Sequence, residues 1–213
     1  MKVLLVNGSP HKEGCTHAAL SEVAKSLNKN GIDTEIFRIG TKPISGCVAC
    51  LKCNELKKCV FDDVVNEFTE KAREADGFIF GSPVHYAGAT GAITSFMDRA
   101  FYSGFRGGTG TFRLKPAACV VSARRAGTTA TFDQLNKYFT ISEMPIVSSR
   151  YWNMVHGANP DDVAKDEEGL LTCRVLGENM SYMLRCIEVA KKHGVTQPVP
   201  QTPVFTNFIR AER

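Results

Sequence analysis

The sequence of 213 residues lacks an apolar run of about 20 residues, the length that a helix needs to span a bilayer. It also lacks a run of basic residues, because lysines and arginines are interspersed with acidic residues and the net charge is only +4. The first absence excludes a membrane-spanning helix, and the second argues against a nucleic-acid partner. The apolar opening MKVLLVN is too short for a signal-peptide core, so we expect a cytoplasmic protein.

The chain also lacks a composition break and an internal repeat. We therefore expect one domain over residues 1–195, with a cysteine-rich insertion at 43–61 and a tail at 196–213. The tail contains three prolines in TQPVPQTPVFTNFIR, and these are followed by the apolar residues Phe205, Phe208 and Ile209. A segment of this kind cannot fold alone. We expect it to lie across a second subunit as a dimer arm.

Short apolar runs alternate with segments of helical periodicity along the whole chain. The expected strands are 2–7, 34–39, 77–81, 115–122 and 145–148. The expected helices are 16–30, one that begins at 62–63, then 92–102, 131–141 and 161–193, and an interruption is considered for the last. Continuous rather than alternating apolar runs are typical of parallel strands covered on both faces. The pattern predicts an α/β fold: a flavodoxin-like, doubly wound, five-stranded parallel sheet with strand order 2-1-3-4-5, which binds ligands at the carboxyl ends of its strands.

The loop after the first strand, GSPHKEGCT, has neither a GxGxxG fingerprint nor a GxxxxGK[ST] loop. Their absence argues against a dinucleotide site and an NTPase P-loop. The loop is nevertheless rich in small and hydroxyl residues and leads into a helix, whose first N–H groups can bind a phosphate. The candidate contacts are Ser9, His11, Cys15 and Thr16. The alternative is an ordinary turn with a helix cap.

Two stretches together resemble the NADPH-dependent FMN reductase family of flavodoxin-like proteins. They are NGSPHKEGCTHAAL and GSPVHYAGATGAITSFMDRA, and the resemblance extends from Met1 to about Asn153. It implies FMN as the cofactor, NAD(P)H as the electron donor and a dimer as the common assembly. His11 stands where the family often has Arg, and Cys15 where Ser, Gly or Asn is usual.

The resemblance places the isoalloxazine ring against the loop after the third strand. The expected contacts are Pro83, Val84, His85, Tyr86, Ala87 and Gly88. Pro83 is expected to fix a backbone bend, and Tyr86 offers a flat face for stacking. Alternatively, this is an ordinary turn with Tyr86 packed on the sheet. We assign no catalytic residue, and His85 is the one candidate proton donor, although a loop histidine with no such role explains it equally well.

The loop after the fourth strand borders the pyrimidine end of the flavin in the family. Its candidate contacts are Ser122, Arg124 and Gly127. Arg124 and Arg125 could attract the phosphates of NAD(P)H, or they could simply be solvated. Asp98 and Arg99 are a family feature, which we interpret as a surface ion pair or a dimer contact without a catalytic role.

Half of the eight cysteines fall in GCVACLKCNELKKCVFDD, namely Cys47, Cys50, Cys53 and Cys59. Three thiols two residues apart, closed by a fourth, resemble the cluster run of bacterial ferredoxins. The stretch also resembles the motif of iron-sulfur flavoproteins, a branch of the same family that binds one [4Fe–4S] cluster. The alternatives are a zinc site, a redox dithiol, and cysteines that serve only the packing of the loop. Cys119, Cys173 and Cys186 are expected to be buried small hydrophobes.

No Ser/His/Asp or carboxylate constellation points to hydrolysis. We expect an FMN-dependent oxidoreductase that passes electrons from NAD(P)H or a reduced carrier to a small-molecule or protein acceptor, as a homodimer or higher homo-oligomer. One alternative is an electron-transfer module with a [4Fe–4S] cluster, and another is a thiol-based redox sensor.

Overall fold

The computed structural model describes residues 1–204 and 206 and contains a mostly parallel sheet between two layers of helices. The strands are β1 (Lys2–Asn7), β2 (Asp33–Arg38), β3 (Gly77–His85), β4 (Gly88–Ala89), β5 (Ala117–Ala123) and β6 (Met154–His156). They are ordered β2-β1-β3-β5-β6, and the short β4 pairs antiparallel with β3. The five parallel strands thus have the predicted order, and the flavodoxin-like fold is confirmed.

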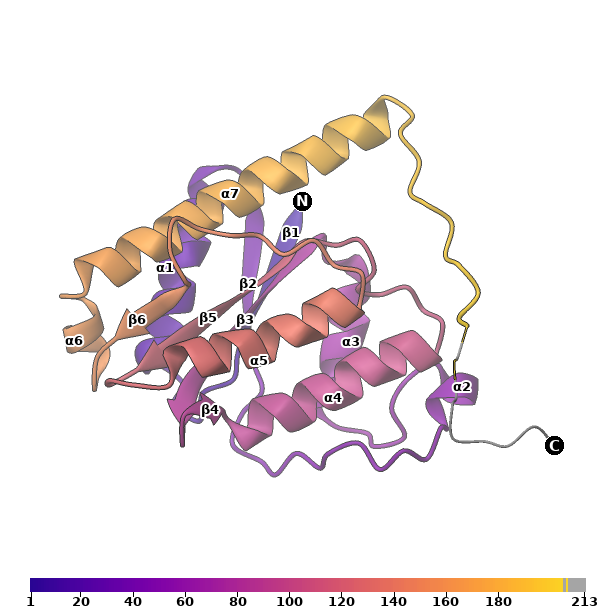
Figure 1. The fold of residues 1–213 in the computed structure, drawn as a ribbon, viewed down its shortest axis with the longest axis horizontal. Coiled ribbons are helices and arrows are strands. Elements are labelled where there is room, and N and C mark those ends of the chain that lie inside the picture. Colours follow the sequence, from indigo (N-terminus) through magenta and orange to yellow (C-terminus); the bar gives the residue numbers. More distant parts are fainter. Residues whose placement is uncertain (205, 207–213) are drawn as a thin grey trace.

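Helices cover both faces of this sheet (Figure 1). They are α1 (Cys15–Lys29), α2 (Cys53–Leu56), α3 (Val64–Glu74), α4 (Gly91–Arg106), α5 (Thr128–Ile141), α6 (Pro160–Val163) and α7 (Glu167–Lys192). One hydrophobic core joins the sheet to α3, α4 and α5, and the other joins it to α1 and α7. The short α2, which the sequence pattern does not predict, lies within the cysteine-rich segment.

The strand β1 shows why the apolar runs are continuous. Leu4 and Val6 are buried in the core beneath α3, α4 and α5, while Val3 and Leu5 are buried in the core beneath α1 and α7. Since successive strand residues point to opposite faces and both faces are covered, every position in the run must be apolar.

The predicted fifth strand at 145–148 is wrong as a regular strand. Ile146 forms only an isolated bridge with Ala117, at the amino end of β5. The chain then leaves the sheet and returns at Met154, which pairs with Val121. Two successive segments therefore pair with β5. Apolar character alone favours 145–148 as the strand, whereas the regular pairing is made by β6. The predicted interruption of the last helix is correct, because α6 ends at Val163 and α7 begins at Glu167.

Residues 196–204 form no helix or strand, and the carbonyl of Pro198 accepts a hydrogen bond of 3.0 Å from Arg113 Nη1. Phe205, Phe208 and Ile209, on which the expected dimer arm depends, lie outside the described residues. Within the part of the chain that the structure describes, no helix combines the length and the apolar character needed to cross a membrane.

Candidate functional site

The loops after β1, β3 and β5 meet at the carboxyl edge of the sheet. Gly8 N donates a hydrogen bond of 2.9 Å to the carbonyl of Gly81. The buried hydroxyls of Thr16 and Ser122 lie 2.8 Å apart, which connects the start of α1 to the end of β5. Three segments that are distant in sequence therefore form one edge, at the switch point where ligands bind in this fold.

A buried asparagine orders the loop after β1. Asn7 Oδ1 accepts a hydrogen bond of 3.0 Å from Ser9 N, and its Nδ2 donates to the carbonyl of Lys12 at 3.3 Å. Ser9 is itself buried, and its hydroxyl accepts from the backbone N–H of His11 at 3.1 Å. The His11 side chain is exposed. The role of Asn7 could not be predicted from the sequence, where it is only the last residue of an apolar strand.

The start of α1 has no side-chain cap. Its N-cap residue is Gly14, and no acidic residue lies in the first turn. The thiol of Cys15 donates to the carbonyl of Gly157, directly after β6, at 3.6 Å. Its contact with a cofactor stays a prediction. The first N–H groups at the positive end of the helix have no side-chain cap, and the first turn carries no acidic residue, which suits an anionic ligand.

Beyond β3 the chain forms a tight hairpin rather than the loop expected at 82–88. Pro83 lies inside the parallel ladder with Ser122, so the prediction that it fixes a bend is wrong. The turn comes at Tyr86 and Ala87, whose φ angles of 49° and 60° are left-handed. Left-handed values at both central residues are typical of the tight turns that match strand twist.

Tyr86 occupies the tip of this hairpin and has a relative exposure of 106%. The alternative in which its ring packs on the sheet is therefore wrong. His85 is also exposed and pairs with Gly88. The hairpin itself is held in place, because Gln134 Oε1 on α5 accepts a hydrogen bond of 3.0 Å from Ala89 N.

The loop after β5 touches the hairpin at Gly127. This residue has a φ of 94°, and a Cβ there would lie 2.6 Å from Ala87 Cα, so only glycine fits. Gly127 also precedes α5 without a side-chain cap. Arg124 and Arg125 are exposed in the same loop. The start of α5, which also has no side-chain cap, therefore lies at the same edge of the sheet as the start of α1.

Comparison with known proteins identifies the family of the chain. Residues 1–159 match the family described as NADPH-dependent FMN reductase. The chain belongs to this FMN reductase family. It is 32% identical over 195 residues to the iron-sulfur flavoprotein MJ1083 of Methanocaldococcus jannaschii, covering 88% of this chain and 100% of that protein.

Other relatives extend the comparison. The chain is 30% identical to the iron-sulfur flavoprotein MJ0731 of the same organism, covering 90% of this chain and 98% of that protein. Among solved structures, the flavoenzyme NAD(P)H:(acceptor) oxidoreductase FerB of Paracoccus denitrificans superposes with a TM-score of 0.63. It is 16% identical, and the match covers 87% of this chain and 97% of that chain. This structural likeness shows the fold.

The carboxyl edge fits the flavin mononucleotide that the FMN reductase family implies. The uncapped start of α1 offers N–H donors for a phosphate, and hydrogen bonds of Asn7 and Ser9 order the loop before it. The exposed ring of Tyr86 offers an aromatic face for stacking, and Gly127 allows the loop after β5 to approach the hairpin closely. The three loops that carry the predicted contacts meet at this edge, and the contacts of their individual residues with FMN stay a prediction.

The second site of this FMN reductase family member is the cysteine-rich segment between β2 and α3. A single pocket is lined by Cys47, Cys50, Cys53 and Cys59, together with Arg99 and Tyr102 of α4. All eight cysteines lie in the described part of the chain, and none forms a disulfide. Burial, together with the nearby thiols of the other three, raises the pKa of Cys53. The thiol of Cys53 therefore lies close to the other three.

The donor set of this pocket consists of four cysteine thiols. Soft thiolates of this kind bind zinc or iron-sulfur clusters. Ala49 and Leu51 alternate with the cysteines and have left-handed φ angles of 51° and 60°. Left-handed residues direct successive backbone N–H groups toward one point, where they can bind an anion, as at many iron-sulfur sites. Among residues 1–204 and 206, no group of three His, Cys, Asp or Glu side chains is arranged to hold a single metal ion.

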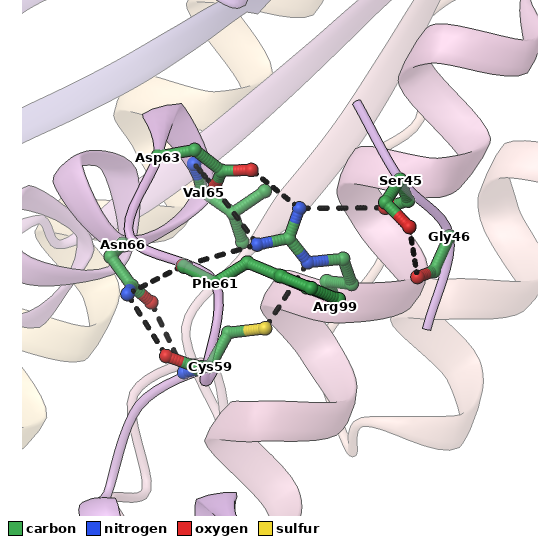
Figure 2. Close-up of polar contacts among 8 residues, drawn as sticks. All are labelled: Ser45, Gly46, Cys59, Phe61, Asp63, Val65, Asn66 and Arg99. Atoms are coloured by element: carbon green, nitrogen blue, oxygen red, sulfur yellow. Dashed lines mark hydrogen bonds and ion pairs between the residues drawn. The ribbon is translucent and has the colours of Figure 1, made fainter. Parts of the chain in front are cut away.

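Arg99, on α4, lies directly beneath the cysteine segment and is only 1% exposed (Figure 2). Its Nε donates to Cys59 Sγ at 3.1 Å, while its two terminal nitrogens donate to the two carboxylate oxygens of Asp63 at 2.6 and 2.8 Å. The same nitrogens donate to the carbonyls of Ser45 and Phe61. The guanidinium also lies 4.8 Å from the centre of the Phe61 ring. Every part of the guanidinium has a partner.

This arrangement corrects the interpretation of Asp98 and Arg99 as a surface ion pair, and the burial of Arg99 excludes that residue from a dimer contact. Arg99 pairs with Asp63 instead, and Asp98 accepts a hydrogen bond of 2.5 Å from the hydroxyl of Tyr138. Burial opposes the charge of Arg99, but its hydrogen bonds to Asp63 and Cys59 outweigh that effect and raise its pKa. In the sequence, Arg99 falls on the apolar, inward face of the predicted helix. A prediction of a surface charge overlooks that position.

The cysteines outside this segment follow the predictions in part. Cys119 and Cys173 are buried, and burial raises the pKa of Cys173 to about 12. Both behave as core residues, as expected. Cys186 is exposed on α7, so its predicted burial is wrong.

Proposed function

We propose that the protein is an FMN-dependent oxidoreductase of the iron-sulfur flavoprotein type, with a [4Fe–4S] cluster on Cys47, Cys50, Cys53 and Cys59 as a second redox centre. One observation carries the proposal: all four thiols line one pocket above a buried arginine. The full-length likeness to MJ1083, whose name states an iron-sulfur flavoprotein, supports it.

The chain's own residues position the two cofactors. The N–H groups at the start of α1 would bind the FMN phosphate, and the β3–β4 hairpin with Gly127 would border the ring. The four thiolates would bind the cluster, while Arg99 and Asn66 hold Cys59. When bound, FMN would supply hydride and electron chemistry, and the protein tunes it through hydrogen bonds and nearby charge.

We also propose NAD(P)H or a reduced carrier as the electron donor, with a small molecule or a protein as the acceptor and a homodimer or higher homo-oligomer as the assembly. The exposed Arg124 and Arg125 beside the hairpin support a nicotinamide nucleotide, whose phosphates a guanidinium can bind in bidentate fashion. Replacing both arginines with Ala should raise the KM for NADPH strongly. An unchanged KM would exclude this role.

The proposal is tested with protein purified without oxygen. The absorption spectrum should show the bands of an oxidised flavin and a broad shoulder that dithionite bleaches, with about four iron atoms per chain. The variant Cys59→Ser should lose iron but keep FMN. Cys186→Ser is the matched control, because this thiol is exposed and lies outside the site. Fewer than about one iron per chain in the unaltered protein would reject the cluster.

The second candidate is an NAD(P)H-dependent flavin reductase without a cluster, in which the thiols act as a redox dithiol. The free, exposed state of Cys47 and Cys50 favours it. In that case the purified protein would contain FMN without iron, and a disulfide would form on mild oxidation. Colourless protein that ignores added FMN would exclude both candidates.

A further inference from the structure

The hydrogen bond from Arg99 to Cys59 is fixed from the arginine side. A guanidinium has five N–H donors, and the contacts to Cys59, Asp63, Ser45 and Phe61 use all of them. Asp63 cannot move freely either, since it is the N-cap of α3 and accepts a hydrogen bond of 3.0 Å from Val65 N. The plane of the guanidinium, and with it the direction of Nε–H, is therefore determined by the fold.

The cysteine side of the contact is fixed as well. Asn66 Oδ1 accepts from Cys59 N at 3.1 Å, and Asn66 Nδ2 donates to the carbonyls of Cys59 and Phe61 at 3.0 and 2.9 Å. Figure 2 shows these bonds on the opposite side of Cys59 from Arg99. Since Asn66 is buried, the backbone of Cys59 is held against α3 while its sulfur meets α4. Cys59 thus differs from Cys47 and Cys50, which are exposed.

We propose that Arg99 is a positioning residue that holds the Cys59 sulfur as an anionic ligand and, balanced by Asp63, sets the reduction potential of the cluster. The proposal rests on the function proposed above. Hydrogen bonds to ligand sulfurs and nearby charges are the means by which proteins tune such potentials. A reduced cluster carries one more negative charge than the oxidised cluster, so a donor or cation beside a ligand stabilises the reduced form.

Because Arg99 pairs with Asp63, replacing one or the other residue should shift the reduction potential of the cluster in opposite directions. Loss of the arginine removes the N–H donor and leaves the carboxylate unpaired, so the reduced cluster is destabilised. Loss of the carboxylate charge leaves the arginine beside Cys59 with its full positive charge, so the reduced cluster is stabilised. A residue that served only the packing of the loop would not give shifts of opposite sign.

The test uses whole protein with its cluster, titrated with dithionite and redox mediators and followed by electron paramagnetic resonance. The variant Arg99→Gln should shift the potential to more negative values, and Asp63→Asn to more positive values. We expect each to change the ratio of reduced to oxidised cluster at least about tenfold, which is about 59 mV for one electron. Asp62→Asn is the matched control, because Asp62 is exposed and adjacent, and it should leave the potential nearly unchanged.

The outcomes separate this proposal from the proposed function. Iron and sulfide analysis of the unaltered protein comes first, and absence of a cluster would overturn the proposed function and this proposal together. A cluster whose potential is unmoved, or moves in the same direction in both variants, would overturn this proposal alone. If Arg99→Gln fails to retain iron, Asp63→Asn decides, because asparagine is an equally good helix cap. A positive shift then supports the proposal and no shift overturns it.

Discussion

Thr16 Oγ1 and Ser122 Oγ lie 2.8 Å apart although 106 positions separate the two residues. The contact joins the first helix to the end of a central strand, at the point where the FMN phosphate is proposed to bind. Because both hydroxyls are buried, removing one leaves the other without its partner.

We therefore expect Thr16→Val to lower the free energy of unfolding by about 1–3 kcal/mol, the cost of an unsatisfied buried hydroxyl. We expect the same variant to weaken FMN binding. Urea unfolding and quenching of FMN fluorescence measure the two effects. Thr140→Val, an exposed threonine on α5, is the matched control and should change neither quantity. Unaltered FMN affinity in Thr16→Val would place the phosphate elsewhere.

Tyr86 combines full exposure with a left-handed backbone, a combination that contributes nothing to folding stability. Tyr86→Gly should leave the free energy of unfolding unchanged or raise it by up to about 1 kcal/mol, because the strain at a positive φ is relieved. The same variant should bind FMN more weakly, while Tyr86→Phe, which keeps the ring, should bind normally. Equal affinity in the glycine and phenylalanine variants would show that the ring does not contact the flavin.

The close approach of Gly127 to Ala87 gives a third prediction. Gly127→Ala should destabilise the protein by about 1–3 kcal/mol, since it adds a backbone clash to a left-handed conformation, and it should reduce FMN binding. Gly31→Ala is the matched control, because Gly31 also has a positive φ but meets no atom within 4 Å. It should show only the conformational cost, with FMN binding intact. Normal FMN binding by Gly127→Ala would contradict the proposed position of the ring.

Acid stability depends on Glu35, which lies between Lys2 on β1 and Lys71 on α3. Hydrogen bonds from these two lysines hold the pKa of the Glu35 carboxyl below its ordinary value. A lowered pKa in the folded state gives stability that is present above the unfolded-state pKa and lost as pH falls through the folded-state pKa.

We therefore expect Glu35→Gln to lose less stability than the unaltered protein between about pH 5 and pH 3. The measurement is the urea midpoint as a function of pH. Glu178→Gln, at an exposed position on α7, should follow the unaltered protein. A curve for Glu35→Gln that parallels that of the unaltered protein would exclude this contribution.

The fold and the flavin edge could be predicted largely from sequence because their signals are local. The apolar run of β1 and the turn residues at Gly8 and Ser9 lie next to each other in the chain, and helical periodicity marks α1 directly. The fifth strand could not be placed, since both Ile146 and Met154 pair with β5 and only the path of the chain decides which pairing is regular.

The environment of Arg99 could not be predicted for the same physical reason. Its partners Asp63 and Ser45 are 36 and 54 positions away, so the sequence of α4 places this arginine on the buried stripe without indicating its partners. The spacing of the cysteines predicted that the thiols would gather. It contained no information about the charged pair that would lie beneath them.

The helix α4 touches both sites with one rigid element. At its start, Thr90 Oγ1 donates to the carbonyl of Gly8, and further along the same helix Arg99 donates to Cys59. Each residue of a helix advances about 1.5 Å and turns about 100°, so one inserted residue between these contacts would swing the guanidinium away from the sulfur. Grafting residues 43–61 alone onto another sheet of this kind would therefore transfer the thiols without their arginine. A successful transplant must include α4 with the same number of residues between Thr90 and Arg99.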